Sequence, residues 1–250
     1  MKKIFVALAF TALCLTGCSG DFAIGTSTLP YPVISFTIDD GDEEQWVPLF
    51  DQKGITGTSY VITGDSFMTE KHWAQLRNLQ SKGWDIGGHT RNHLILPSLP
   101  KAQMEDEIAG CYSDLKKHGI VNPVSFAYPH GEFNDSVIAE TQKYFKSGRS
   151  VIGGENVYPY TAIYQLRETD GDTNPLHSLE QMAALAKRKN QWMIVLLHTN
   201  HADQEQDVKK SQTISAFIDF VHAQNIKVMT VAEVMKVRKL SAAAAESPIE

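Results

Sequence analysis

The sequence is poor in cysteine, with only three in 250 residues, at positions 14, 18 and 111. So few cysteines exclude a small fold built on a framework of disulfide bonds. Positive charge is also scarce. The chain has 23 lysine and arginine residues and 29 aspartate and glutamate residues, which gives a formal net charge of −6. This balance leaves no basic patch for a phosphate backbone, and we expect no nucleic-acid partner.

Glycine-rich phosphate-binding motifs are missing as well. Neither G-x-G-x-x-G nor G-x-x-x-x-G-K-[ST] occurs, which weakens the case for a nucleotide-binding fold. Apolar residues, in contrast, make up 42% of the chain, enough for one sizeable core. A length of 250 residues is compatible with a single domain of the α/β class.

The longest apolar run lies at the amino terminus, where Lys2 and Lys3 precede the apolar residues 4–15. This run is too short for a membrane-spanning helix and has the layout of a secretory signal peptide. Residues 15–18 read L-T-G-C and resemble the lipobox of bacterial lipoproteins. We therefore expect a signal peptide over residues 1–17, with a lipid anchor and tether over residues 18–30. The alternatives are an ordinary signal peptide or a buried helix.

A lipid on Cys18 would anchor the chain to a bacterial membrane in the cell envelope, either in the periplasm or at the surface. Cys111 would then be the one cysteine left with a free thiol, which excludes an internal disulfide despite an oxidising location. Because Cys111 lies within a helical pattern, we expect it to be a small buried hydrophobic residue.

Strand and helix patterns alternate along the rest of the chain. Short β-branched or apolar runs predict strands at residues 33–38, 59–62, 84–86, 124–127, 192–197 and 227–230, with two more between 147 and 174. Amphipathic patterns predict helices at residues 43–53, 70–81, 101–118, 135–145, 178–189 and 212–223. Thr230 and Glu233 have the spacing of a capping box for one more helix. Residues 241–250 are expected to be disordered.

About seven strands that alternate with helices predict a parallel sheet. At this length the sheet is either a closed (β/α) barrel or an open doubly wound sheet. In both, the loops at the carboxyl ends of the strands build the active site, because several strands converge only there.

Ionisable residues gather at three of these strand ends. Asp39 and Asp40 follow the first strand, His89 and His93 follow the third, and His198 follows the apolar strand at 192–197. Each group alone is also compatible with turn chemistry, helix capping or a solvent-facing histidine. Together they supply one carboxylate and two imidazoles for a catalytic metal ion, with one carboxylate and one imidazole left for acid and base chemistry.

These residues resemble the motifs of a known family. Residues 37–41 read T-I-D-D-G and are similar to the T-F-D-D-G motif of the polysaccharide deacetylases of carbohydrate esterase family 4, the NodB-homology group. Residues 89–93 match its H-[ST]-x-x-H motif, residues 196–198 match L-x-H, and residues 126–131 resemble F-A-Y-P-Y-G. The resemblance implies a distorted (β/α) barrel over residues 31–240 and metal-dependent hydrolysis of acetyl groups on a carbohydrate.

The resemblance also implies roles for individual residues. Asp40, His89 and His93 would hold a divalent metal ion, with zinc favoured over cobalt or nickel. Asp39 would be the general base for the attacking water, and His198 would be the general acid that protonates the leaving amine or alcohol.

On the substrate side, the backbone N–H of His130 would stabilise the oxyanion. Leu196 would line the pocket for the acetyl methyl group. Tyr128, which lies in the same motif as His130, would be a third residue that faces the substrate. His130 stands where the motif has tyrosine, so its imidazole adds a titratable group next to the metal ligands.

Two further departures from the family pattern concern supporting residues. Ala127 stands where many members have an arginine that positions the base, and we expect Arg167 to pair with Asp39 instead. No clear match exists for the fourth motif, whose aspartate orients the catalytic histidine. Asp170 is the preferred candidate for that role and Asp172 the second.

Histidines outside the motifs, among them His72 and His118, are expected at the surface.

The leading hypothesis from the motifs is a membrane-anchored, metal-dependent carbohydrate deacetylase that prefers polymers of N-acetylglucosamine. A second hypothesis keeps the site but assigns it an O-acetyl ester or a small amide as substrate. A third is a carbohydrate-binding lipoprotein without catalytic activity.

Overall fold

The computed structural model describes residues 32–157, 160, 162–199 and 202–237. The predicted signal peptide, tether and carboxyl-terminal tail lie outside these residues and stay predictions. Within the described part of the chain, no helix combines the length and hydropathy that a membrane span requires.

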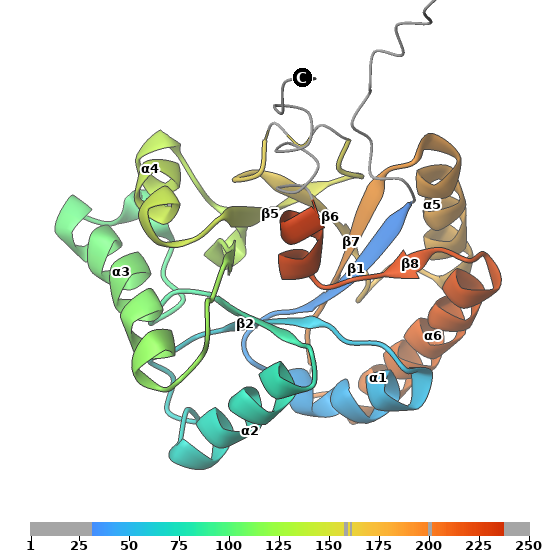
Figure 1. Ribbon diagram of the computed structural model, residues 1–250, viewed down its shortest axis with the longest axis horizontal. Coiled ribbons are helices and arrows are strands. Elements are labelled where there is room, and N and C mark those ends of the chain that lie inside the picture. Colours follow the sequence, from blue (N-terminus) through green and yellow to red (C-terminus); the bar gives the residue numbers. More distant parts are fainter. Residues whose placement is uncertain (1–31, 158–159, 161, 200–201, 238–250) are drawn as a thin grey trace, which may run out of the picture.

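Seven parallel strands form a closed barrel with the helices outside it (Figure 1). They are β1 (Val33–Ile38), β2 (Thr58–Val61), β3 (Asp85–Gly88), β4 (Ser125–Ala127), β5 (Ser147–Gly153), β6 (Leu166–Asp170) and β7 (Trp192–Leu197). Strands β2 to β7 are neighbours in chain order, and β1 closes the ring by pairing with both β7 and β2. The structure therefore confirms the barrel and excludes the open sheet.

The closure of the barrel is uneven because two strands share one edge of β1. Thr37 and Ile38, at the end of β1, pair with β2. Val33 and Ile34, at its start, pair instead with the two-residue strand β8 (Lys227–Val228). The barrel is thus joined between β1 and β2 only where the last two residues of β1 pair with the first two residues of β2, at the end of β1 that the motif residues follow.

The α-helices are α1 (Val47–Lys53), α2 (Glu70–Ser81), α3 (Lys101–Lys117), α4 (Asp135–Tyr144), α5 (Leu176–Lys189) and α6 (Gln204–Ala223), with a further helical segment at 231–237. Three short 3₁₀ turns, η1 (Glu43–Gln45), η2 (Leu96–Ser98) and η3 (Pro129–Gly131), lie between them. The capping box is confirmed, because Glu233 accepts from the backbone N–H of Thr230 and Thr230 accepts from that of Glu233.

Helix α6 begins eight residues earlier than its apolar pattern predicts. Its first turns carry charged residues, so the pattern alone places the start too late. Asp203 provides the missing signal, because its side chain accepts a hydrogen bond of 3.0 Å from the backbone N–H of Gln206.

Side chains along β1 alternate between an apolar outer face and an inner face that becomes polar toward the end of the strand. Phe36 packs outward against Phe50 of α1 and Phe217 of α6, with ring centroids 5.5 and 6.0 Å apart. Two of the inward residues of β1, Ser35 and Thr37, are polar, and Thr37 donates to the carbonyl oxygen of Val195 on β7. Since side chains of a strand alternate between faces, the residue two positions after Thr37 also points into the barrel. That residue is Asp39.

Candidate active site

A sharp turn after β1 sends two adjacent carboxylates in different directions. Asp39 continues the strand, with its N–H donating to the carbonyl oxygen of Leu197, and its side chain is buried. Asp40 has a φ of 64° and Gly41 a φ of 77°, which turn the chain away from the barrel. The side chain of Asp40 is consequently about one-third exposed at the mouth of the barrel.

The buried partner of Asp39 is Arg149 on β5. The guanidinium of Arg149 is fully buried and donates through Nη2 to Oδ2 of Asp39. Burial alone would raise the pKa of Asp39, but the positive charge of Arg149 outweighs it, with help from His89 and His198, and holds the pKa below its usual value. Asp39 is therefore an ionised carboxylate inside the barrel.

The expectation that Arg167 pairs with Asp39 is wrong. Arg167 lies on β6 at a position that points outward, where its side chain is exposed and donates to the carbonyl oxygen of Gly153. Arg149 lies at an inward position of the neighbouring strand. The signal for Arg149 in the sequence is a lone arginine among small residues in a predicted strand, S-G-R-S at 147–150.

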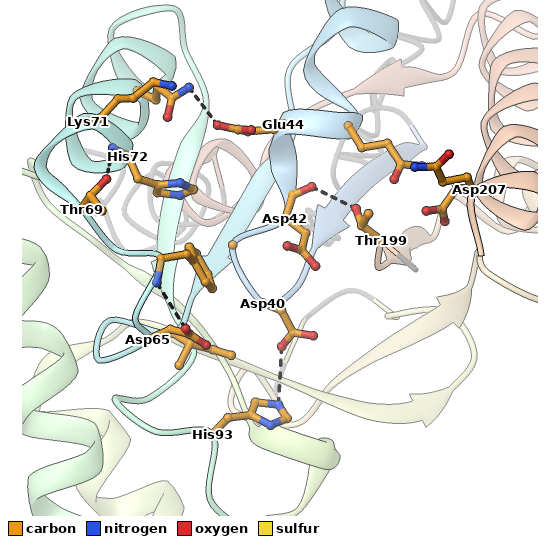
Figure 2. A pocket seen from close by; sticks show the side chains of 16 residues that line it. Asp40, Asp42, Glu44, Asp65, Thr69, Lys71, His72, His93, Thr199 and Asp207 are labelled. Carbon is orange, nitrogen blue, oxygen red and sulfur yellow. Dashed lines mark hydrogen bonds and ion pairs between the residues drawn. The ribbon is translucent and has the colours of Figure 1, made fainter. Parts of the chain in front are cut away.

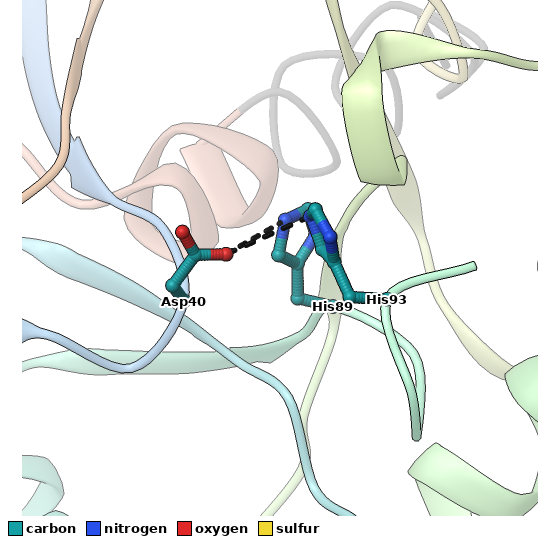
Figure 3. A group of neighbouring side chains, drawn as sticks. All are labelled: Asp40, His89 and His93. Atoms are coloured by element: carbon teal, nitrogen blue, oxygen red, sulfur yellow. Dashed lines mark ion pairs between the residues drawn. The ribbon is translucent and has the colours of Figure 1, made fainter. Parts of the chain in front are cut away.

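The metal-ligand candidates Asp40, His89 and His93 lie together at the barrel mouth (Figure 3). Their ligand atoms lie within 4.8 Å of one another. Oδ1 of Asp40 is 3.7 Å from Nε2 of His89 and 3.6 Å from Nε2 of His93. Figure 3 shows the carboxylate of Asp40 directed at both rings.

The loop that carries the histidines is not helical. Thr90 has a φ of 66° and His93 a φ of 54°, so two residues of the H-x-x-x-H motif adopt the left-handed conformation. Glu107 of α3 stabilises this loop by accepting hydrogen bonds from the backbone N–H groups of Arg91 and Asn92. Without such partners the left-handed conformation of a β-branched residue such as Thr90 would be unfavourable.

The three side chains fit a divalent cation by their chemistry. Nδ1 of His89 lies 2.8 Å from the carbonyl oxygen of Ala127, so Nδ1 carries the proton and Nε2 has its lone pair free for a metal. Oδ1 of Asp40 is buried and has no hydrogen-bond partner. Bonds of ~2.0–2.1 Å in a tetrahedral site place ligand atoms roughly 3.3 Å apart, close to the separations seen here.

His198 lies on the other side of Asp39. Its Nε2 is 3.9 Å from Oδ2 of Asp39, and its Nδ1 is 2.6 Å from Oδ2 of Asp172. Burial would lower the pKa of His198, but the hydrogen bond to Asp172 and the charges of Asp39 and Asp172 raise it to about 9. His198 is therefore an imidazolium at neutral pH, as a general acid requires.

Asp172, the second candidate, and not Asp170 holds His198. Oδ1 of Asp172 also accepts from the backbone N–H of His198 and lies 3.1 Å from Nζ of Lys210. Asp170 instead caps its own turn and accepts from the backbone N–H groups of Asp172 and Thr173. The preference for Asp170 was wrong because the sequence does not show that Asp170 is used by its own turn.

The substrate-side candidates occupy different environments. His130 is exposed, has a φ of 55°, and its ring lies 4.5 Å from that of His93 between centroids. Leu196 is buried on the inner face of β7. Tyr128 does not reach a substrate with its side chain, because that side chain is buried in the core and its hydroxyl donates to the carbonyl oxygen of Tyr164.

A hollow of about 950 Å³ opens beside the metal-ligand candidates (Figure 2). Asp40 and His93 contribute to its lining. In Figure 2, residues of α2 and the loop before it, such as Thr69 and His72, form one side, and Thr199 and Asp207 lie on the other. The hollow therefore connects directly with the reactive groups.

Comparison with known proteins agrees with this geometry. Residues 26–145 match the family model described as polysaccharide deacetylase. A peptidoglycan-N-acetylglucosamine deacetylase from Bacillus cereus is 24% identical over 210 residues, which cover 82% of this chain and 88% of the relative. The family match includes Asp39, Asp40, His89 and His93 and ends before Arg149.

Solved structures share the fold at low sequence identity. The Xyl-CE4 domain of a multidomain xylanase, from the hindgut metagenome of Trinervitermes trinervoides, has a TM-score of 0.61 at 16% identity, over 84% of this chain and 92% of that chain. A pseudoenzyme of carbohydrate esterase family 4 from Bacillus anthracis has a TM-score of 0.60 at 14% identity, over 82% of this chain and 66% of that chain.

The barrel gathers carboxylates and imidazoles at one mouth, an arrangement that suits an enzyme catalysing hydrolysis. The family match over residues 26–145 and the Bacillus cereus relative both indicate a polysaccharide or peptidoglycan deacetylase.

We predict that the protein binds about one Zn²⁺ per chain and that His93→Ala weakens this binding at least roughly 100-fold, because it removes a direct ligand. Isothermal titration calorimetry of the metal-free protein measures the affinity. His118→Ala is the matched control, since His118 stacks on Trp73 and is not part of the ligand cluster. Equal affinities for the two variants would contradict the assignment.

Proposed function

We propose that the protein removes N-acetyl groups by metal-dependent hydrolysis from a carbohydrate polymer that contains N-acetylglucosamine. One observation carries the proposal, namely the position of Asp39 between the two halves of the site. Its Oδ2 lies 3.6 Å from Nε2 of His89 and 3.9 Å from Nε2 of His198. A base in this position can accept a proton from a water next to the metal ligands. The general acid lies on the other side of the base.

The residues divide the reaction between them. A divalent ion held by Asp40, His89 and His93 would polarise the acetyl carbonyl and lower the pKa of water. Asp39 accepts a proton from the water as its oxygen bonds to the acetyl carbon. His198 then donates its proton to the nitrogen of the leaving amine as the C–N bond breaks, so that acetate and a free amino sugar are released.

Arg149 and Asp172 keep the base and the acid in opposite protonation states. Arg149 keeps Asp39 ionised, and Asp172 keeps His198 protonated, so both groups are in the required state at neutral pH. We propose that the backbone N–H of His130 faces the oxyanion and that Leu196 faces the acetyl methyl group.

The proposal is tested by acetate release from N-acetylglucosamine oligomers, peptidoglycan and acetylated xylan. We expect release from the N-acetyl substrates, its loss with a chelator and its recovery with Zn²⁺, Co²⁺ or Ni²⁺. Activity on acetylated xylan alone would support the O-acetyl ester alternative, whereas binding without turnover would support a non-catalytic carbohydrate-binding protein. Activity that resists the chelator would contradict metal dependence.

Arg149→Ala should lower kcat roughly 10- to 100-fold, because Asp39 loses the cation that orients it. Arg167→Ala should leave kcat within about twofold of the wild type, since Arg167 contacts Gly153 and not Asp39. Steady-state kinetics with an N-acetylglucosamine tetramer measures both, and thermal melting checks that both variants are folded. A comparable loss in the two variants would contradict the assignment of Arg149.

The alkaline limb of the kcat profile should lie near pH 9, where His198 loses its proton. Asp172→Asn should move this limb to lower pH, because a neutral amide no longer stabilises the imidazolium. Asp219→Asn, an exposed position on α6, is the control and should leave the limb in place. An unchanged limb in Asp172→Asn would show that Asp172 does not set the pKa of His198.

We also propose that the chain is exported and anchored to the bacterial membrane through a lipid on Cys18. The support is the charged start, the apolar run and the L-T-G-C sequence at residues 15–18. Labelled palmitate should be incorporated into the full chain expressed in a bacterium, and Cys18→Ser should abolish the label. Cys111→Ser should retain it. Label that persists in Cys18→Ser would refute the anchor.

A further inference from the structure

The α2 side of the hollow contains a buried acid and base pair that the reaction does not use. Glu43 follows the first motif at the start of η1, and its side chain is 1% exposed. His72 lies in the first turn of α2 and is 8% exposed. Oε1 of Glu43 is 3.3 Å from Nε2 of His72, and Oε2 of Glu43 accepts a hydrogen bond of 2.8 Å from Ser59.

The burial of His72 is the opposite of the surface position expected from sequence. Its ring is in edge contact with Phe67, with centroids 5.3 Å apart, and it lines the same hollow as Asp40 and His93. Glu43, His72 and Ser59 come from three different segments that meet only in the folded barrel. Bringing a carboxylate and an imidazole out of water is costly, and a buried pair adds little net stability over well-packed apolar residues.

The hollow has room for more than the sugar residue whose acetyl group reacts. Ligand pockets typically measure about 300–1,000 Å³, and this one, at about 950 Å³, is at the upper end of that range. Its lining includes the carboxylates of Asp42 and Glu44 and the amide of Gln75, together with Lys71 and Phe67. Carboxylates and amides are suited to the hydroxyl groups of a sugar, which donate to them.

We propose that this side of the hollow is a subsite for a neighbouring sugar residue of the polymer, and that His72, oriented by Glu43, is a substrate-binding residue of that subsite. The inference rests on the proposed function, since it assumes a carbohydrate polymer at the mouth. Glu43 is a positioning residue, because its Oε1 lies 3.3 Å from Nε2 of His72 and leaves Nδ1 for an oxygen of the sugar.

The protonation of His72 suits this role. The hydrogen bond to Glu43 raises the pKa of His72 above its usual value, against the effect of burial and with further support from the charges of Glu43, Glu44 and Asp42. A protonated imidazole has two N–H groups, of which Nε2–H faces Oε1 of Glu43 at 3.3 Å and Nδ1–H is a second donor. An imidazole with a lower pKa would present Nδ1 as an acceptor.

The experiment measures kcat and KM for acetate release from an N-acetylglucosamine tetramer by the metal-loaded protein. His72→Ala should raise KM roughly 3- to 10-fold, the effect of one lost hydrogen bond, with kcat unchanged. Glu43→Gln should raise KM less, because the amide still accepts from Nε2. His118→Ala is the matched control and should not change KM, since its ring stacks on Trp73 and is not part of the lining.

A KM within twofold of the wild type in His72→Ala, or a fall in kcat at constant KM, would overturn the inference while leaving the proposed function intact. If His72→Ala melts early, His72→Gln is measured in its place, and its amide should restore part of the affinity. If the wild type releases no acetate, the proposed function fails. The affinity for the tetramer, measured by calorimetry, then tests the subsite. A lower affinity in His72→Ala than in the wild type supports it, and equal affinities overturn it.

Discussion

The buried pair between Arg149 and Asp39 is the interaction on which the rest of the site depends. A carboxylate placed inside a barrel would ordinarily take up a proton, because burial disfavours its charged form. The guanidinium of Arg149, itself fully buried, reverses this preference and keeps Asp39 ionised. The ionised carboxylate then lies within 4 Å of both His89 and His198, so the electrostatics of the metal-ligand candidates and of the acid both depend on it.

Supporting contacts hold each reactive group in one orientation. The carbonyl oxygen of Ala127 sets the tautomer of His89, and Asp172 sets the ring of His198. The backbone also carries strain at the site. Seven non-glycine residues of the described chain have a positive φ, of which three are asparagines and the other four are site residues, namely Asp40, Thr90, His93 and His130. Such conformations cost about 1 kcal/mol or more each and persist where the surrounding contacts enforce them.

Residues on adjacent strands show what the sequence could and could not predict. The alternation of strands and helices and the capping box at Thr230 follow from periodicity and local hydrogen bonding, the family resemblance implies the barrel, and the structure confirms all three. The expectation that Arg167 pairs with Asp39 failed because it depends on which face of a strand points inward, and one position of error reverses the face. The choice of Asp170 over Asp172 failed because both lie in one turn, and only folding shows which of them the turn itself uses.

The sequence by itself determined the parallel strands and the strand ends at which Asp39, Asp40, His89, His93 and His198 would meet, because parallel strands converge at their carboxyl ends whatever their neighbours are. Only the tertiary structure decided the partners, Arg149 for Asp39, Asp172 for His198 and Glu43 for His72. These pairs join segments as far as 110 residues apart. Local patterns contain no information on such pairs, because they form when the closed barrel brings inward side chains of different strands and loops together.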